Sequence, residues 1–570
     1  MFMPLPISSE AFEMLSITEI EPWYQELLNQ PLSQEVLSSW IKQWSDLSAL
    51  VDETVIRFEI ATTCNTADEE VEQRKHTFME EVYAPIQKLD QRIKQQLLAS
   101  GLEPAGFAIP LRNLRAEAEL YREENLPLLN EDKALSDEYM QVGGSQMVWW
   151  KGKEVALASL YPVLHDPKRD EREQVWHAIT ERQLKDREKL DAIWSKKMQL
   201  RQQIARNAGY DDYRAYRWRQ LLRFDYTPAD CRKLHEAVKQ VIVPTASQMW
   251  EKRRRQLGVE TLRPWDMWVN PRISEAPRSI TDVDGLLRQC ADAFRLIDPQ
   301  LGDYFEIMIR EQLLDLEERP NKAPGGYELP LEVKHRPFIF GRVNSITDIM
   351  GLIFHEAGHA FHVFETIPLP YLHQRKEGAV PFEFAEVAST SMEFIGGMYL
   401  QQAGLCTEQE AAQLRIQHLE SLLMSDLPVL IKGDAFQHWI YDHPEEAKDA
   451  ENCRQKWAEL TRFYQPDIDW SGLETELSNG WQGILHFYCD PFYFIEYAFA
   501  SLGAFQVWNN YLRNPEAALR QYRSALALGA TETLPELYEA VGAKFAFDAE
   551  TLQLVSHMVI QTVEQLEAQA

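Results

Sequence analysis

The chain has 570 residues, far more than one ordinary hydrophobic core can fill, so we expect several lobes or subdomains. Apolar residues make up 45% of the sequence and aromatic residues 11%, which is ample material for burial in a globular protein. The formal charge of −30 repels phosphate backbones and anionic lipid, and this argues against nucleic-acid and membrane-surface partners.

The amino-terminal segment MFMPLPISSEAFEML lacks the basic region and apolar run of a signal peptide. No stretch of the chain approaches the ~20 uncharged apolar residues that a membrane-spanning helix needs. The six cysteines are scattered without any CxxC pair, which favours thiols in a reducing compartment over a disulfide framework or a cysteine zinc site. We therefore expect a cytoplasmic protein.

Most of the chain has the periodicity and composition of helices. Residues 66–100 and 167–208 are the clearest examples, and their dense mixed charges are typical of a solvated helix face. No sharp boundary is visible, and we place one near residue 150, between an amino-terminal helical lobe at 1–150 and the remainder at 151–570. The expected fold class is therefore mainly α.

Strand signals are few. Residues 146–152 and 336–343 are rich in β-branched and aromatic residues and are bounded by Gly or Pro. Pro324, Gly325 and Gly326 form a turn signal just before the second of these segments. The sequence predicts one small sheet near residues 325–345.

The segment SITDIMGLIFHEAGHAFHVFE, residues 345–365, combines three polar side chains with an apolar helical pattern. Residues four apart share one helix face, so His355 and His359 can direct two imidazoles at one point, and imidazole is a preferred ligand of zinc. Glu356 lies next to them, where it can accept a proton from a water molecule at the ion. Ser345 with Asp348 resembles a capping box that starts the helix.

A catalytic zinc ion needs a third protein ligand. Glu386 begins an apolar helix-like run downstream, where an unpaired carboxylate would be costly to bury, and it is the preferred candidate. His362 follows His359 by almost one turn and is expected to pack or to support a ligand. Glu393, seven residues after Glu386, returns to the same face and is either a hydrogen-bond partner of a ligand or a structural residue.

A second informative stretch is NGWQGILHFYCDPFYFIEYAFASLGAFQVW, residues 479–508. Asp490 and Pro491 have the pattern of a helix N-cap and first helical position, which puts Tyr493 and Tyr497 on one helix face. His486 precedes them in a segment flanked by glycines. From these residues alone, a core aromatic stripe is the simpler interpretation of the two tyrosines.

HEAGH, the glutamate of AEVAST 31 residues after the first histidine, and HFYCDPFYFIEY resemble in their order the oligoendopeptidase F and thimet oligopeptidase family of zinc peptidases. The resemblance implies one Zn²⁺ per chain, held by His355, His359 and Glu386, with Glu356 as the general base. It implies an almost wholly helical ellipsoid with a deep substrate channel and a small sheet beside the zinc helix.

The same resemblance implies that His486, Tyr493 and Tyr497 donate hydrogen bonds to the oxyanion of the reaction. Family members often carry a tyrosine where this chain has Ile495, so the main donor stays open between Tyr493 and Tyr497, with Tyr488 as a weaker candidate.

We also expect an extended peptide to pair with a free edge of the strand at 337–343, a contact that involves Gly325, Gly326, Phe340 and Gly341. The resulting hypothesis is a zinc-dependent oligoendopeptidase that cuts internal bonds of short unstructured peptides. The alternatives are a peptidyl dipeptidase or other exopeptidase of the same fold, and a non-catalytic metal-binding or peptide-binding protein.

Overall fold

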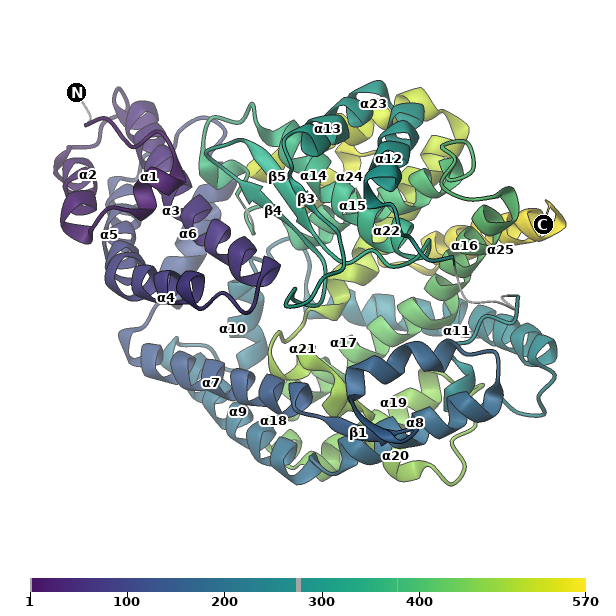
Figure 1. The fold of residues 1–570 in the computed structure, drawn as a ribbon. Helices are drawn as coiled ribbons and strands as arrows, with labels where there is room; N and C mark the ends of the chain where they lie inside the picture. The colour runs from purple at the N-terminus through teal and green to yellow at the C-terminus, as the bar shows by residue number, and fades with distance from the viewer. Residues whose placement is uncertain (1–2, 273–277, 377, 570) are drawn as a thin grey trace. The chain divides into compact units, whose positions relative to one another are not determined.

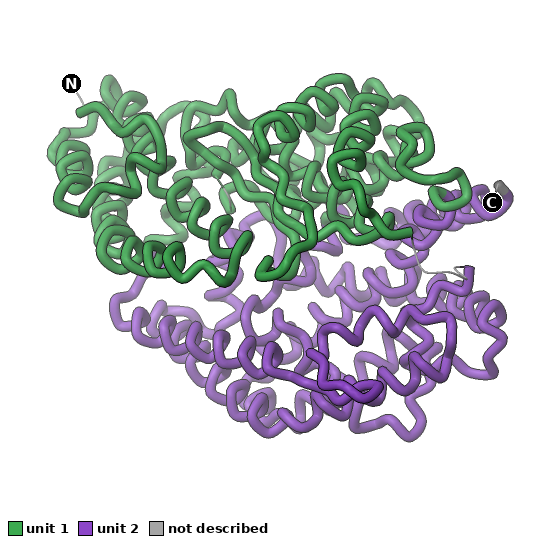
Figure 2. The backbone as a smooth tube through the Cα atoms, in the orientation of Figure 1, with its two compact units in different colours: residues 1–118, 277–411, 500–545 green, residues 119–276, 412–499, 546–570 purple. Residues whose placement is uncertain are grey.

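Helices account for most of the computed structural model, which describes residues 3–272, 278–376 and 378–569 (Figure 1). The mainly α fold class is therefore confirmed. The chain divides into two compact units (Figure 2). Unit 1 comprises Met1–Ala118, Pro277–Ala411 and Ala500–Phe545, and unit 2 comprises Glu119–Ala276, Ala412–Phe499 and Ala546–Ala570. The division expected near residue 150 remains a prediction.

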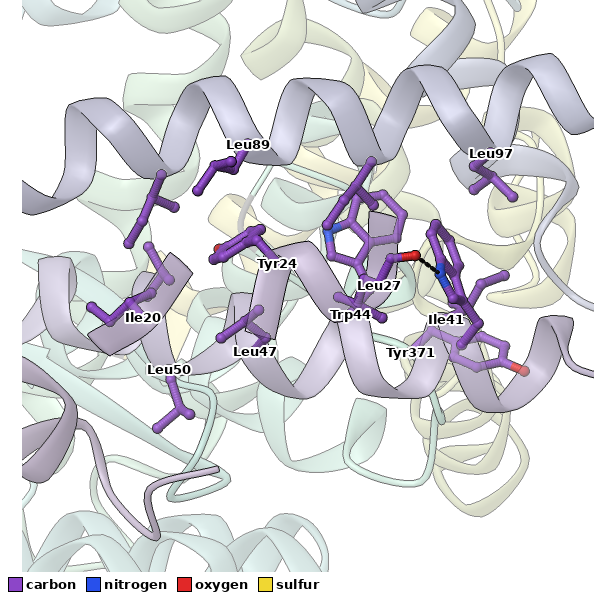
Figure 3. Packing of buried hydrophobic residues seen from close by; sticks show 14 of the residues in the cluster. Ile20, Tyr24, Leu27, Ile41, Trp44, Leu47, Leu50, Leu89, Leu97 and Tyr371 are labelled. Atoms are coloured by element: carbon purple, nitrogen blue, oxygen red, sulfur yellow. Dashed lines mark hydrogen bonds between the residues drawn. The ribbon is translucent and has the colours of Figure 1, made fainter. Parts of the chain in front are cut away.

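The amino-terminal part of unit 1 is helical throughout. Its elements are α1 (Ser9–Glu13), α2 (Ile17–Asn29), α3 (Leu37–Cys64), α4 (Glu69–Phe78), the π-helix η1 (Met79–Tyr83), α5 (Ala84–Ser100) and α6 (Ala108–Leu120), in which the unit ends. The helical prediction for residues 66–100 is confirmed. Apolar side chains of α2, α3 and α5 meet in one core, where Trp40 Nε1 donates a 3.0 Å hydrogen bond to the carbonyl oxygen of Leu27 (Figure 3).

The rest of unit 1 carries the sheet and the helices around it. Its elements are α12 (Val283–Ile297), α13 (Pro299–Arg310), β3 (Leu314–Asp315), β4 (Tyr327–Leu331), β5 (Arg336–Phe340), the π-helix η5 (Ile349–Phe354), α14 (His355–Thr366), η6 (Leu372–Gln374), α15 (Phe382–Gly396), η7 (Gly397–Tyr399), α23 (Pro515–Leu526), η10 (Gly529–Thr531) and α24 (Leu534–Ala540).

The described residues of unit 2 form helices and one hairpin. Its elements are η2 (Glu123–Asn125), α7 (Leu126–Gly144), β1 (Met147–Trp150), β2 (Lys153–Ala156), η3 (Leu157–His165), α8 (Arg169–Leu184), α9 (Arg187–Asn207), α10 (Tyr213–Gln220), α11 (Pro228–Leu257), η4 (Pro264–Asp266), η8 (Leu422–Asp426), α17 (Leu427–Asp442), α18 (Pro444–Ala447), α19 (Ala450–Tyr464), α20 (Glu474–Asn479), η9 (Gly480–Gly483), α21 (Leu485–Tyr488) and α25 (Ala549–Gln569). The boundaries between the units also fall within α16 (Glu408–Ser421) and α22 (Phe494–Arg513). The predicted strand at 146–152 and helices at 167–208 are confirmed.

The sheet of unit 1 has the strand order β3-β5-β4. β5 pairs in parallel with β3 and antiparallel with β4, with Leu329 opposite Phe338. The strand expected at 336–343 is confirmed over Arg336–Phe340, but the expectation that it has a free edge is wrong, because it is the central strand. The edge on the other side belongs to β4, which directly follows the turn at Gly325 and Gly326.

A buried lysine holds the end of β5 in place. The ammonium group of Lys322 donates to the carbonyl oxygens of Gly341 at 2.6 Å and Asp315 at 2.9 Å, and to the Asp315 carboxylate at 2.8 Å. The backbone N–H of Gly341 also donates to Asp315, at 2.9 Å. Because charged groups are costly to bury without partners, this set of acceptors fixes where the chain leaves the sheet towards α14.

The helical segment that leads into α14 begins close to the capping box predicted at Ser345 and Asp348. The Asp348 carboxylate accepts hydrogen bonds from the backbone N–H groups of Asn344 and Ser345, at 2.8 and 2.9 Å, which is one half of the expected capping box. The Ser345 hydroxyl contacts Thr347 instead of completing it. A π-helical turn then leads into α14, which ends at Thr366, two residues before Pro368.

Helices α14 and α15 make direct backbone contact at Gly358. A Cβ atom at this position would lie 2.5 Å from Ser389 Cα and 2.6 Å from the Ala388 carbonyl oxygen. Only a residue without a side chain fits this approach, since forcing extra atoms into a packed core costs ~1–3 kcal/mol or more. The contact determines how near the two helices lie.

Among the described residues, none of the helices combines the length and the apolar character that a membrane crossing requires. The expected cytoplasmic location remains a prediction.

Candidate metal centre

The three predicted metal ligands meet in unit 1. His355 and His359 occupy successive turns of α14, and Glu386 lies on the facing side of α15. His355 Nε2 is 3.3 Å from Glu386 Oε2, and His359 Nε2 is 3.6 Å from Glu386 Oε1. Each imidazole therefore faces a different oxygen of the same carboxylate.

This geometry fits a single tetrahedral ion. Zinc bonds of ~2.1 Å at tetrahedral angles place ligand atoms about 3.4 Å apart, close to both observed separations. The three donor atoms all lie within 4.8 Å of one another, and the two imidazole rings stand at 81° with centroids 5.1 Å apart. The donor set of two imidazoles and one carboxylate is one that zinc prefers, so the residues fit the metal.

Glu393 orients the first histidine. Its Oε1 lies 2.7 Å from His355 Nδ1, so the neutral ring keeps its proton on Nδ1 and has Nε2 free to bind a metal. Burial by itself would lower the pKa of His355, but the hydrogen bond and charge of Glu393, with the charges of Glu386 and Glu356, raise it to about 9. Of the two roles left open for Glu393, the geometry supports the hydrogen-bond partner.

Glu386 is kept ionised in a buried position. Its side chain is 3% exposed, and burial raises its pKa, but the neighbouring His359 and His355 and the Ser389 hydroxyl lower it overall. Ser389 Oγ donates to Glu386 Oε2 at 2.8 Å. The sequence analysis did not identify Ser389, although its position three residues after Glu386 on a helix was a usable signal.

Glu356 follows His355 on α14 and is 8% exposed. Burial raises its pKa, the charges of His359 and His355 oppose this, and Glu386 and Glu393 add to the rise. A carboxylate whose pKa lies above the ordinary value is a better proton acceptor near neutral pH. A Cβ built on Gly326 would lie 3.8 Å from Glu356 Oε1, so the glycine turn before β4 runs beside this carboxylate.

His362 does not join the metal ligands. It is buried, and its ring packs against Phe384 at a centroid distance of 6.0 Å. Burial, together with the charge of His359, lowers the pKa of His362 to about 3, so it is a neutral packing residue. The expectation that His362 packs is confirmed.

The other predicted catalytic residues form a local cluster in unit 2. The His486 ring stacks on Tyr493 with centroids 4.5 Å apart, and the hydroxyl groups of Tyr493 and Tyr497 are 2.7 Å apart. Burial lowers the pKa of His486, although Asp490 opposes this, so the ring is neutral at pH 7. The three side chains are half-buried.

The local structure differs from the predicted helix start. α22 begins at Phe494 and not at Pro491, because Phe492 has a positive φ of 70° that interrupts the helix. Tyr493 therefore precedes the helix and Tyr497 lies in its first turn. His486 lies in the short helix α21.

The predicted substrate-contacting residues fall into two pairs. Gly325, with a φ of 99°, and Gly326 form the turn before β4. Phe340 is fully buried and stacks on Tyr327 at 4.8 Å, and both backbone groups of Gly341 are already hydrogen-bonded. Phe340 and Gly341 thus support the sheet, while the turn lies beside Glu356.

The comparison with known proteins agrees with the metal centre described above. The model for peptidase family M3 matches residues 163–284 and 299–556, and the model for the peptidase M3 N-terminal domain matches residues 8–105. The chain therefore belongs to peptidase family M3, a family of zinc metallopeptidases, and it is an enzyme of that class. Among curated proteins, none matches the chain.

Solved structures give the same result in more detail. A structure of PZ peptidase A with an inhibitor has 26% identity and a TM-score of 0.86, and the match covers 98% of each chain. A crystal structure described as an oligoendopeptidase F has 25% identity and a TM-score of 0.86, with 98% of this chain and 99% of that chain covered. An oligoendopeptidase F structure from Bacillus anthracis shares the fold at 23% identity, with a TM-score of 0.81 over 97% and 96% of the two chains. The resemblance expected from the motifs is confirmed.

Replacing Glu393 by Gln should weaken metal retention about 10–100-fold, the usual effect of losing a hydrogen-bond partner of a metal-bound histidine. Competition against a chelator, followed by metal analysis, measures this change. Glu365→Gln is the matched control, since Glu365 on α14 pairs with Arg523 and not with a ligand. Wild-type metal retention in Glu393→Gln would show that Glu393 has only a packing role.

Proposed function

We propose that this M3 peptidase is a zinc-dependent oligoendopeptidase that hydrolyses internal bonds of short unstructured peptides, with one Zn²⁺ bound by His355, His359 and Glu386. The observation that carries the proposal is the convergence of these three ligands next to the buried Glu356. The bound ion supplies Lewis-acid polarisation of the scissile carbonyl and of a water molecule. Peptides are the expected substrates, and the cytoplasm is the proposed location.

The side chains of the protein divide the remaining work. Glu356 accepts a proton from the attacking water and passes it to the leaving amine, a transfer that its raised pKa favours. Glu393 keeps His355 in the tautomer that leaves Nε2 available. The hydrogen bond from Ser389 Oγ keeps the Glu386 carboxylate in one orientation.

His486, Tyr493 and Tyr497 are proposed to donate hydrogen bonds to the oxyanion that develops at the attacked carbonyl. Support comes from the family motif and from the local cluster, in which a neutral histidine and two hydroxyl groups are gathered. Such donors act most strongly where charge develops in the transition state.

Substrate binding is proposed at the turn of Gly325 and Gly326 and at the start of β4. β4 is paired with β5 on one side and is the last strand of its sheet. An extended peptide added along such an edge gains backbone hydrogen bonds, and the proximity of Gly326 to Glu356 would bring it to the reacting groups.

Glu356→Gln tests the role of the general base. The variant should keep its metal, because Glu356 is not a ligand, while kcat falls about 10²–10⁴-fold through loss of proton transfer. Metal analysis and peptide-cleavage kinetics on one preparation separate the two effects. Substantial cleavage by Glu356→Gln would remove this residue from the mechanism.

Phe substitutions at Tyr493 and Tyr497 identify the main oxyanion donor. Loss of that hydroxyl should lower kcat about 10²–10³-fold with little change in KM, as for other oxyanion donors. Tyr488→Phe is the control, since Tyr488 is fully buried and its hydroxyl contacts the Leu190 carbonyl oxygen at 3.4 Å. Full activity in the Tyr493→Phe/Tyr497→Phe double variant would exclude both tyrosines.

A series of peptides of increasing length, each with free ends and with both ends blocked, distinguishes an endopeptidase from an exopeptidase. We expect doubly blocked peptides to be cleaved internally, and folded proteins to resist. Mass spectrometry of the products gives the cleaved bonds. Release of dipeptides from free ends, with no cleavage of blocked peptides, would favour the peptidyl dipeptidase alternative.

Gly325→Val should raise KM while kcat stays near the wild-type value, because a side chain at this turn obstructs the start of the β4 edge and a β-branched residue resists its positive φ. Gly101→Val is the control, since Gly101 also has a positive φ, 65°, and has open space around it at the end of α5. An unchanged KM in Gly325→Val, with stability comparable to that of Gly101→Val, would place substrate binding elsewhere.

A further inference from the structure

A second cluster of metal-ligating side chains lies inside unit 2. Cys231 and His235 are four residues apart on α11, and Asp434 and His438 are four residues apart on α17. Each pair therefore projects from one face of its helix, as His355 and His359 do on α14. The thiol, one carboxylate oxygen and an imidazole nitrogen of Cys231, Asp434 and His438 all lie within 4.8 Å of one another.

Two histidines contact one oxygen of the Asp434 carboxylate. His235 Nε2 is 2.7 Å from Asp434 Oδ2, a good hydrogen bond, and His438 Nε2 is 3.4 Å from the same oxygen. His235 therefore fixes the orientation of the Asp434 carboxylate, as Ser389 does for Glu386.

The cluster is buried. Cys231 and Asp434 have no exposed surface, and His438 is 3% exposed. Aromatic rings of Phe492 and Trp218 lie 5.3 and 5.9 Å from the His438 ring and limit the access of water.

Two polar atoms in this cluster lack a hydrogen-bond partner within the described residues: His438 Nε2 and Asp434 Oδ1. Buried polar atoms in folded proteins nearly always have a partner, so two such atoms at one place indicate a missing ligand. Arg214 Nη1 approaches the opposite nitrogen of the ring, His438 Nδ1, at 3.5 Å, while its shorter contact, 2.5 Å, is with Asp442. The ring therefore directs Nε2 into the cluster.

The charges also fit a divalent cation. A thiolate and a carboxylate carry two negative charges, and one M²⁺ ion neutralises both. Uncompensated charges would be costly in this buried cluster. A hydrogen-bonded Asp434 between two histidines, without an ion, is the rival arrangement, and it leaves Oδ1 without a hydrogen bond and His438 Nε2 with only the long 3.4 Å contact to Oδ2.

We propose that Cys231, Asp434 and His438 bind a second divalent metal ion, of the class that thiolate and imidazole favour, such as Zn²⁺, and that His235 supports it through Asp434. The ion links α11 to α17 in the interior of unit 2. Its closed, water-poor surroundings suit a structural role, in which metal binding stabilises the folded unit. This site does not depend on the proposed catalytic function.

Cobalt replacement tests the proposal on the full-length protein. A thiolate bound to Co²⁺ gives a ligand-to-metal charge-transfer band in the near ultraviolet, and the site of His355, His359 and Glu386 contains no sulfur. We expect two metal equivalents per wild-type chain and this band after reconstitution with Co²⁺. One equivalent and no sulfur band, at saturating Co²⁺, would overturn the proposal.

Single-residue variants show which side chains give rise to the sulfur band. Cys231→Ser should remove the band and one equivalent and lower Tm, and His438→Gln should do the same if Cys231→Ser does not fold. Cys453→Ser is the control, since Cys453 is also buried in unit 2 and donates to the Ala447 carbonyl oxygen. His359→Ala should lose the other equivalent and keep the band, so a failure of the catalytic proposal can be told apart from a failure of this one. A band that survives in Cys231→Ser would refute the assignment.

Discussion

The direct backbone contact between α14 and α15 at Gly358 is the constraint on which the metal centre depends. Side chains normally keep helix axes 8–10 Å apart, and the missing Cβ lets the helix of the two histidines approach Ser389 and Ala388. This approach brings Glu386 within reach of both imidazoles. The Tyr522 hydroxyl donates to the Ala388 carbonyl oxygen at 2.9 Å, a further contact that fixes the same stretch of α15.

Compensation of buried charge is the second organising feature. The carboxylates Glu356, Glu386 and Glu393 lie around two imidazoles in unit 1, and each is nine-tenths or more buried. None would be stable there as an isolated ion. Together with a divalent cation they form a set of mutually satisfied groups, and the pKa shifts of His355 and Glu386 in opposite directions express this attraction. The same attractions between opposite charges thus keep these side chains ionised and stabilise their buried positions.

Much of the fold and of the metal centre could be predicted from the sequence where the signal is local. The HExxH spacing encodes its own geometry, since residues four apart must share a helix face. The carboxylate of Glu386 stood out because it interrupts an apolar run. The central position of β5 could not be predicted, because its parallel partner β3 has only two residues, Leu314 and Asp315, and no strand pattern. The positive φ of Phe492, which delays α22, depends on packing and not on a turn residue. The cluster around Cys231 was missed because a search for CxxC pairs does not detect two i, i+4 pairs on separate helices.

The π-helical turn at Ile349–Phe354 has a consequence for how this helix can change. A π turn is an α-helical turn with one extra residue, so the two ends of the continuous helix differ in phase. The π turn begins directly after Asp348, so its own buried apolar residues and the ligand-bearing face of α14 follow different helical periods. A sequence change between β5 and α14 can then alter the winding of this turn without rotating His355 and His359 away from Glu386.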